Sequence, residues 1–312
     1  MARALVFPGQ GSQQVGMGRE LAAAFEMARL VYEEVDDALD QHLSHIIFEG
    51  PESDLVLTEN TQPALMATSI AVLRVLEEGG LKLGEHASVV AGHSLGEYSA
   101  LAAARALALA DTARLLKTRG QAMQRAVPVG KGAMAALLGL DLDAARAVAE
   151  EAAAGQVCDV ANDNAPGQVV VSGHAEAVER AVEIAKRAGA KRAMMLSVSA
   201  PFHCSLMAPA AEVMAEALAA VMVSEPAVPL VSNVAAEPVT DPDTIRAQLV
   251  EQVTSMVRWR ESVTQIKKEG ADGLIELGAG KVLIGLAKRI EPELSLVALL
   301  APSDIEAFLK EL

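Results

Sequence analysis

The hexapeptide Gly92-His93-Ser94-Leu95-Gly96-Glu97 lies between a short apolar run and an alanine-rich stretch that begins near Tyr98. This order predicts a strand, a sharp turn and a helix. Glycines two residues before and two after Ser94 let the backbone turn tightly, because they have no Cβ atom. Ser94 is therefore the candidate nucleophile, and the N–H of Leu95 at the helix start can stabilise an oxyanion. An ordinary turn with a serine cap is the alternative.

Length and charge restrict the class of protein. A chain of 312 residues can bury a large core in one domain or in two unequal ones. Its formal charge of −15 argues against nucleic acid as a partner. The stretch closest to a membrane span, 99–116, contains three charged residues and is predicted as a soluble helix. The first apolar run is too short for a signal peptide, so we expect a cytoplasmic protein with no membrane partner.

The two cysteines, Cys158 and Cys204, do not form a disulfide framework and lack the spacing of a zinc site. Cys204 next to His203 suggests a thiol nucleophile, but neighbouring residues on one backbone rarely face each other. No metal and no cofactor is therefore expected. Because the chain is acidic, an acidic partner must dock on a local basic patch.

Alternating strands and helices predict an α/β fold with a mainly parallel sheet that is covered on both faces. Expected strands of this part are 4–7, 88–91, 230–232, 273–276 and 296–301. Expected helices include 58–78, 111–127, 243–252 and 259–269. Thr61 is a plausible cap of the helix 58–78, with Pro63 in its first turn.

The pattern changes between residues 133 and 198. Strands are expected at 133–138, 157–162, 168–172 and 192–198, with helices at 141–153 and 175–188 and a hairpin turn at Pro166-Gly167. The order β-α-β-β-α-β is that of a ferredoxin-like unit. We therefore predict a small domain, 128–198, inserted into a large domain made of 1–127 and 199–312.

A serine nucleophile needs a base, and His203 is the candidate among six histidines. It is expected to open a helix where the inserted domain returns to the large one, with Phe202 and Met207 to exclude water. Crevices between domains commonly hold sites. A triad would add a carboxylate. Asp159 and Asp163 are possible, but no acid stands out, so a backbone or amide carbonyl is an alternative partner for His203.

Three other features are ambiguous from position alone. Arg119 lies among apolar residues of the helix 111–127, and its position favours a surface arginine. The turn 8–13 can present backbone donors to a substrate, and residues 60–64 can line the site. A tight turn and a helix cap explain these two stretches equally well.

Six stretches taken together carry a family resemblance over essentially the whole chain, in order and at family-like spacing. They are Phe7-Pro8-Gly9-Gln10-Gly11-Ser12-Gln13, Gly92-His93-Ser94-Leu95-Gly96-Glu97, Arg119-Gly120, 162–168, Phe202-His203 and Gly278-Ala279-Gly280-Lys281-Val282-Leu283. The chain resembles the malonyl-CoA:acyl carrier protein transacylases of bacterial type II fatty acid synthesis. The fold of that family, a large α/β-hydrolase-like core with a ferredoxin-like insert, agrees with the predicted one.

The resemblance implies roles at the matching positions. Ser94 would attack the malonyl thioester, and His203 would take its proton and return it to the leaving thiol. The oxyanion would lie against the N–H groups of Gln10 and Leu95. Arg119 would bind the free carboxylate of malonate, which reverses its prediction as a surface residue.

Further roles follow from the same resemblance. Gln252 would orient His203 through its main-chain carbonyl, and Asn162 would be a supporting amide. Leu95 and Phe202 match malonyl-specific members, since a bulky Phe202 would crowd an α-methyl group. Lys288 and Arg289, with Lys281 nearby, are candidates for docking the acidic carrier protein, although solvated charges at a helix end explain them equally well. The family acts as a monomer.

Three alternatives remain at this point. An esterase or thioesterase would share Ser94, His203 and the fold, but would have no use for a buried Arg119. A malonyl transferase subunit of malonate decarboxylase would differ mainly in its carrier protein. A non-catalytic scaffold that docks a carrier would need none of the three residues.

Overall fold

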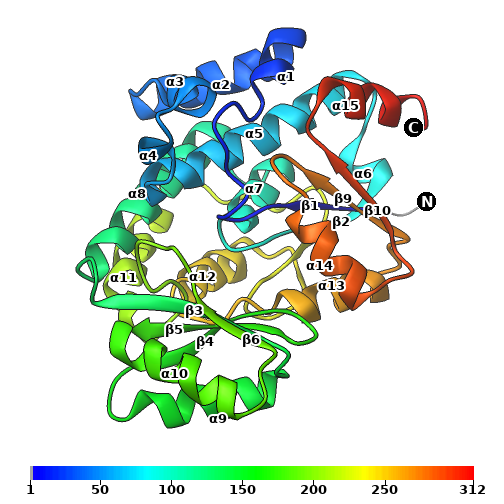
Figure 1. The fold of residues 1–312 in the computed structure, drawn as a ribbon. Helices are drawn as coiled ribbons and strands as arrows, with labels where there is room; N and C mark the ends of the chain where they lie inside the picture. Colours follow the sequence, from blue (N-terminus) through cyan, green and yellow to red (C-terminus); the bar gives the residue numbers. More distant parts are fainter. Residues whose placement is uncertain (1–2) are drawn as a thin grey trace.

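The computed structural model describes residues 3–312, which form two β-sheets (Figure 1). The larger sheet has six strands in the order β10-β9-β1-β2-β7-β8. Its strands are β1 (Arg3–Phe7), β2 (Ala87–Gly92), β7 (Leu230–Val231), β8 (Pro238–Val239), β9 (Gly273–Leu277) and β10 (Ser295–Leu299). Neighbouring strands are parallel except β7 and β8, which are antiparallel. The predicted mainly parallel sheet is confirmed.

Successive residues of β1 point to opposite faces of this sheet, as the period of a strand requires. Ala4 and Val6 belong to a core with α13 (Trp259–Lys268) and α14 (Val282–Ile290). Leu5 and Phe7 belong to the core on the other face, which includes α5 (Thr58–Glu78), α7 (Leu95–Ala103) and α8 (Leu109–Ala126). Since both faces are covered, the central strands are mostly apolar, and Glu276 of β9 is a buried exception.

The other helices surround this framework. They are α1 (Arg19–Ala24), α2 (Glu26–Leu39), α3 (Leu43–Glu49), α4 (Glu52–Leu55), α6 (Leu83–His86), α11 (Ala208–Ala219), α12 (Pro242–Gln252), α15 (Pro302–Leu309) and a 3₁₀ turn, η1 (Ser205–Met207). Figure 1 shows α1 to α4 gathered beyond α5 and far from the small sheet. Within residues 3–312, every helix is too short or too polar to cross a bilayer.

The second sheet has four antiparallel strands in the order β4-β5-β3-β6. Its elements are β3 (Gly132–Leu138), α9 (Leu142–Ala153), β4 (Cys158–Ala165), β5 (Gln168–His174), α10 (Ala175–Arg187) and β6 (Arg192–Met195). The two helices share with one face of this sheet a separate apolar core. The ferredoxin-like order is thus confirmed, whereas the domain boundaries at residues 128 and 198 remain a prediction.

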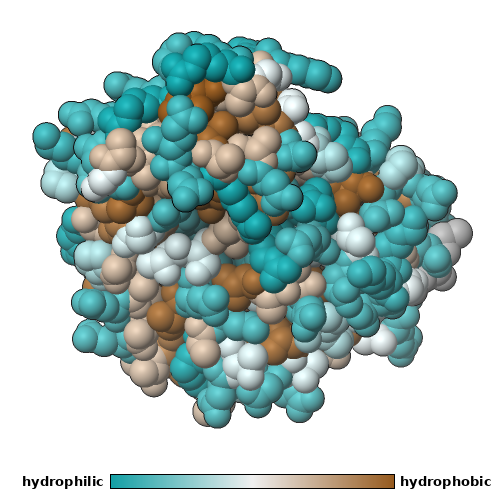
Figure 2. Space-filling view, turned by 90° about the horizontal axis from the view of Figure 1, so that it is seen from below, coloured by the Kyte–Doolittle hydropathy of each residue, from teal (hydrophilic) through white to brown (hydrophobic). Residues whose placement is uncertain are grey.

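Seen from the side of the small sheet, the surface is mostly hydrophilic, and its hydrophobic residues lie in small separate patches (Figure 2). Met194 and Met195 of β6, in the small sheet, are among the exposed large hydrophobic residues. This face therefore offers no large apolar area of the kind that marks an obligate interface.

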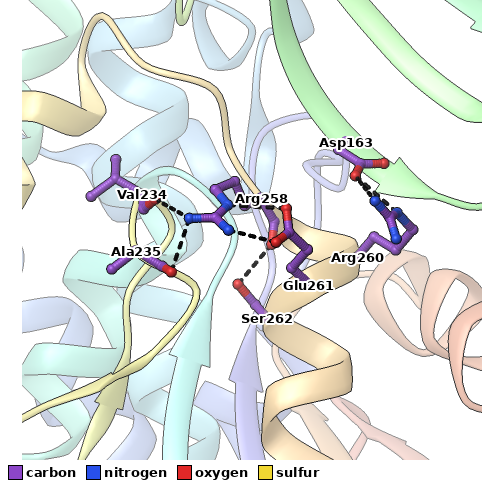
Figure 3. Close-up of polar contacts among 7 residues, drawn as sticks. All are labelled: Asp163, Val234, Ala235, Arg258, Arg260, Glu261 and Ser262. Atoms are coloured by element: carbon purple, nitrogen blue, oxygen red, sulfur yellow. Dashed lines mark hydrogen bonds and ion pairs between the residues drawn. The ribbon is translucent and has the colours of Figure 1, made fainter. Parts of the chain in front are cut away.

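The small sheet is linked to the segment before α13 by an isolated parallel bridge between Asn162 of β4 and Val257. Val257 donates its N–H to Ala161 O at 2.9 Å and accepts from the N–H of Asp163 at 3.0 Å. An ion pair of 2.7 Å between Asp163 and Arg260 of α13 reinforces the link (Figure 3). These contacts hold the small sheet beside the end of the large one.

Three local expectations were wrong. The last strand of the insert ends at Met195 and not at residue 198. Helix α5 begins at Thr58 after Leu57, so Thr61 lies within its first turn; its hydroxyl donates instead to Leu55 O at 2.5 Å. His203 precedes the turn η1 in non-helical backbone, with φ of 57°, and does not open a helix.

Candidate active site

Ser94 lies in the sharp turn between β2 and α7, and its φ of 54° is in the left-handed region. The two flanking glycines are required by close packing. A Cβ on Gly92 would lie 1.9 Å from the carbonyl carbon of Gly96, and one on Gly96 would lie 2.2 Å from Phe7 O. The turn therefore brings backbone into contact where only glycine fits, and Ser94 lies at its tip.

The structure places His203 beside Ser94, with 2.8 Å between Nε2 and the serine Oγ. The other ring nitrogen, Nδ1, lies 2.9 Å from the main-chain oxygen of Gln252. A carbonyl only accepts, so Nδ1 carries the proton and Nε2 is free to accept from the serine. Burial, and after it the charge of Arg119, lower the pKa of His203 to about 3. The imidazole is thus neutral at ordinary pH.

Neither of the two candidate acids contacts His203. Asp159 accepts from the N–H and hydroxyl of Ser205, at 2.8 and 2.9 Å. Asp163 is engaged by Arg260 (Figure 3). The main-chain oxygen of Gln252, and not a carboxylate, is therefore the acceptor that lies beside Nδ1.

Arg119 is buried, with 1% of its surface exposed. The prediction of a surface arginine, made from its position alone, was therefore wrong. Helix α8 packs against α5, and the guanidinium finds neutral acceptors there and on α12. Nη1 donates to Gln62 Oε1 at 2.7 Å; Nη2 donates to Gln252 Oε1 at 2.8 Å and to Ser94 Oγ at 3.1 Å. A buried cation is thereby fixed beside the nucleophile.

These side chains line a pocket of about 350 Å³. The loop after β1 contributes Gln10, the serine turn and α7 contribute Ser94 and Leu95, and α8 contributes Arg119. Phe202 and His203 come from the segment before η1. The strands β3, β4 and β5 contribute Met134, Asn162 and Val170. The pocket therefore lies between the two sheets, where the sequence predicted a site.

The two N–H groups proposed for an oxyanion both belong to residues of this pocket. Leu95 is the first residue of α7, where a helix leaves its N–H groups free. In the described part of the chain, neither the N–H of Gln10 nor that of Leu95 donates a hydrogen bond. Both are thus available to a negatively charged oxygen.

Asn233 is a site residue that the sequence did not reveal. Its side chain accepts from the N–H of Ser94 at 2.7 Å and donates to Gly92 O at 2.7 Å, so it ties both sides of the serine turn. It follows β7, the strand next to β2, and sites in parallel sheets form where adjacent strands end. Its position directly after this strand was the signal in the sequence that could have identified Asn233 as a site residue.

The turn that carries Asn233 is held from outside by Arg258 (Figure 3). The guanidinium donates to the carbonyls of Val234 and Ala235 at 3.1 and 3.0 Å. It also pairs with Glu261 at 2.5 Å, and the N–H of Arg258 donates to Asn233 O at 2.9 Å. An ion pair outside the pocket thus fixes a residue that holds the nucleophile.

Glu97 was also missed as a site residue, although it ends the hexapeptide. It is 1% exposed, and its carboxylate accepts from Gln252 Nε2 at 2.6 Å. Burial raises the pKa of Glu97 to about 7, while hydrogen bonds from Gln252 and Asn233 and the charge of Arg119 lower it less.

The candidate docking residues Lys288 and Arg289 lie in the last turn of α14, and Lys281 lies just before its first residue. All three are exposed. Arg289 already donates to the side chain of Gln168 and to Pro166 O, at 2.5 and 2.9 Å, and so joins α14 to the hairpin of the small sheet. Of Lys288 and Arg289, Lys288 is therefore the one whose side chain is less engaged in contacts within the protein. No cluster that could hold a metal occurs in residues 3–312.

Comparisons with known proteins agree with this geometry. Residues 4–289 match the acyl transferase domain family. A malonyl CoA-acyl carrier protein transacylase from Bacillus subtilis (strain 168) is 46% identical over 310 residues, which cover 99% of this chain and 96% of that one. The structure of an acyl-carrier-protein S-malonyltransferase from Bartonella henselae is 54% identical with a TM-score of 0.97, covering 100% and 99% of the two chains.

A third similar structure is a malonyl-transacylase in complex with an acyl carrier protein of a type II polyketide synthase. It is 44% identical, has a TM-score of 0.97 and covers 100% of both chains. The likeness therefore extends over the whole length of the chain and includes both sheets. The chain belongs to the malonyl-CoA:acyl carrier protein transacylase family of acyl transferases.

Proposed function

We propose that this protein transfers the malonyl group from malonyl-CoA to the phosphopantetheine thiol of acyl carrier protein, and so supplies fatty acid elongation. The observation that carries the proposal is the position of Arg119. Its guanidinium is buried 3.1 Å from the Ser94 hydroxyl, in the same pocket as His203. A buried cation at that place suits an acyl group that ends in a carboxylate.

In the first half-reaction, Ser94 Oγ attacks the thioester carbon and His203 Nε2 takes the hydroxyl proton. The developing oxyanion is bound by the N–H groups of Gln10 and Leu95, each worth roughly 2.7–4 kcal/mol in a comparable site. The carbon–sulfur bond breaks, and the proton on His203 passes to the departing coenzyme A thiol. The product is a malonyl ester of Ser94.

In the second half-reaction, the phosphopantetheine thiol gives its proton to His203 and attacks the same ester. The ester bond breaks, and His203 returns the proton to Ser94. Both halves thus use one base and one oxyanion site, and the enzyme ends unchanged. Apart from the two substrates, we expect no cofactor.

Other residues support these steps. The Gln252 carbonyl keeps the His203 ring in the tautomer with a free Nε2. Asn162, buried in the pocket wall, is a supporting amide. Leu95 and Phe202 favour malonyl over methylmalonyl, because the Phe202 ring leaves little room for an α-methyl group; a pocket methyl is worth about 1–3 kcal/mol of discrimination.

We further propose that acyl carrier protein docks through Lys288 and Arg289, that the protein acts as a monomer and that it resides in the cytoplasm. The small separate hydrophobic patches of the face in Figure 2 are consistent with a monomer. The net charge of −15 makes a local basic patch necessary for binding an acidic carrier.

Intact mass after brief incubation with malonyl-CoA tests the proposal, with Ser94→Ala as the control. We expect a malonyl adduct on the wild-type protein alone, and its transfer when phosphopantetheinylated acyl carrier protein is added. An adduct on Ser94→Ala would contradict the nucleophile. Decay to free malonate at one rate with and without carrier would identify a thioesterase instead. Transfer only to the carrier of a malonate decarboxylase would assign the chain to that complex.

A further inference from the structure

The transfer steps give no role to the carboxylate of Glu97, a buried ionisable group close to Arg119. It lies in the first turn of α7, on the inner side of the serine turn. Glu97 Oε2 accepts from Gln252 Nε2 at 2.6 Å, and Gln252 Oε1 accepts from Arg119 Nη2 at 2.8 Å. A single amide therefore connects the carboxylate of Glu97 to the guanidinium of Arg119.

The two charges determine how this amide is oriented. A guanidinium can only donate hydrogen bonds, and an ionised carboxylate can only accept them. The Gln252 oxygen must therefore face Arg119, and its nitrogen must face Glu97. Because the main-chain oxygen of Gln252 contacts His203, the same link holds the base and the cation in one arrangement.

Glu97 is also the counter-charge of Arg119 in the free protein. Within residues 3–312, the guanidinium of Arg119 donates its hydrogen bonds to neutral side chains, those of Gln62, Ser94 and Gln252. An unpaired buried charge is costly. With Glu97 ionised, the buried cluster has no net charge.

Few other ionisable groups act on Glu97. Tyr98 lies next to it, and burial raises the pKa of this phenol to about 12, so it is neutral at ordinary pH. Burial lowers the pKa of His203 and of His93, which are neutral as well. The buried residues of the neighbouring β1, β2, α5 and β7 include no ionisable side chain. Within residues 3–312, Arg119 of α8 is therefore the charge that acts on the carboxylate from within the core.

The carboxylate of a bound malonyl group changes this balance. When it binds Arg119, the pocket holds one buried cation and two buried anions, and one of the anions becomes unfavourable. The incoming carboxylate contacts the guanidinium directly, whereas Glu97 is separated from it by the Gln252 amide. Protonation of Glu97 restores neutrality and leaves it a hydrogen-bond acceptor for Gln252.

We propose that Glu97 is a positioning residue that neutralises Arg119 in the free protein and takes up one proton from solvent when a malonyl group binds. The inference rests on the proposed function, because it requires a carboxylate on the substrate. Burial has already raised the pKa of Glu97 to about 7, so the group is close to the point at which a second anion would protonate it. The carboxylate becomes a carboxylic acid, and no other bond changes.

The sign of the pH dependence follows from this proton. Above the pKa of Glu97 in the free protein, binding consumes a proton, so the affinity for malonyl-CoA falls as the pH rises. The dissociation constant is expected to increase up to about tenfold per pH unit between pH 7 and 9. Acetyl-CoA brings no carboxylate to Arg119, so it should show no such dependence.

Calorimetry on the Ser94→Ala protein measures the proton directly, because this variant binds the thioester without being acylated. Titrations at pH 8 in phosphate and in Tris give the number of protons taken up. We expect about one more proton with malonyl-CoA than with acetyl-CoA. The two ligands share the coenzyme A part, whose own ionisation therefore cancels. Equal uptake for both ligands would overturn the inference.

Glu97→Gln in the Ser94→Ala background tests which group takes the proton. Glutamine can still accept from Gln252 but cannot be ionised, so the extra proton and the pH dependence should both disappear. Glu276→Gln is the matched control, since Glu276 is a second buried glutamate whose pKa burial raises, and its carboxylate accepts from Leu283 and Ile284 in α14. It should leave the uptake unchanged.

Unchanged uptake in Glu97→Gln would assign the proton to another group and overturn the inference. If that variant does not fold, the comparison of the two ligands in Ser94→Ala decides alone. Absence of a malonyl adduct on the wild-type protein would instead refute the proposed function together with this inference. A normal adduct without extra proton uptake refutes the inference only.

Discussion

Arg119 keeps a full positive charge 3.1 Å from the Ser94 hydroxyl, in a pocket where its recorded hydrogen bonds go to neutral side chains. Removing the guanidinium would leave the malonyl carboxylate buried without a partner. We therefore expect Arg119→Ala to lose about 2–5 kcal/mol of transition-state stabilisation for malonyl transfer. Acetyl transfer should fall far less. The measurement is kcat/KM for the two acyl-CoA substrates.

Arg114→Ala is the control for that change, because Arg114 lies on the same helix with 56% of its side chain exposed and pairs with Asp111. Arg114→Ala should leave kcat/KM unchanged for both substrates. Equal losses for malonyl and acetyl transfer in Arg119→Ala would show that Arg119 does not recognise the carboxylate.

The low pKa of His203 determines how acylation should depend on pH. Since burial lowers it to about 3, the imidazole remains neutral as the pH falls well below the ordinary value of 6.5. The acylation rate at saturating acetyl-CoA should therefore be constant from pH 8 to about pH 5. Rapid-quench acylation measures it, and acetyl-CoA avoids the carboxylate of malonyl. A midpoint near 6.5 that persists in Glu97→Gln, where the glutamate of pKa about 7 is absent, would contradict a buried, neutral base.

At the scale of single elements, the serine turn depends on a residue from another segment. Asn233 is fully buried and accepts from the N–H of Ser94. Asn233→Ala would leave that N–H unsatisfied, so we expect a loss of about 1–3 kcal/mol in the free energy of unfolding together with slower acylation. Urea denaturation and rapid-quench acylation measure the two effects.

Asp241→Ala separates stability from activity in that experiment. Asp241 caps α12 by accepting from the N–H of Thr244, and it lies outside the pocket. The variant should be less stable but should acylate at the wild-type rate. If Asn233→Ala behaved in the same way, Asn233 would have a structural role only.

Sequence and structure agree best where local signals are strong. The turn at Ser94 was predicted because glycines at fixed spacing and the change from strand to helix are visible in a few residues. Asn233 was not, since its contact spans 139 positions and depends on β7 lying beside β2. The burial of Arg119 likewise depends on acceptors from α5 and α12, which its own helix does not reveal.

For the whole molecule, the order of elements predicted both sheets and the insert, because strand and helix periods are properties of each segment. The link between the sheets was not predicted. The bridge at Val257 and the ion pair of Asp163 with Arg260 join residues almost 100 positions apart, and neither segment carries a recognisable signal.

Docking of the carrier protein is a property of the whole surface. Lys288→Glu with Arg289→Glu should raise KM for acyl carrier protein but not for malonyl-CoA, because the change repels an acidic partner. The effect should weaken at high salt. Lys288→Glu alone separates docking from the contacts that Arg289 makes with the hairpin of the small sheet.

Lys186→Glu with Arg187→Glu is the matched control, since this pair also ends an exposed helix, α10 of the small sheet. It changes the net charge by the same amount at a different place. Equal effects of the two double variants would mean that overall charge, and not the end of α14, governs the encounter.

Gln252 acts through two different parts of one residue. Its main-chain oxygen serves the histidine, whereas its side chain lies between the guanidinium and the buried glutamate. Every amino acid has that oxygen, and only the side chain can be exchanged. A substitution at position 252 therefore keeps the acceptor for His203, but it removes the amide that orients Arg119 and that donates to Ser94 O at 3.0 Å. An engineer who wishes to load neutral building blocks can weaken the preference for a charged acyl group there, and must restore the support of the serine turn by a second change.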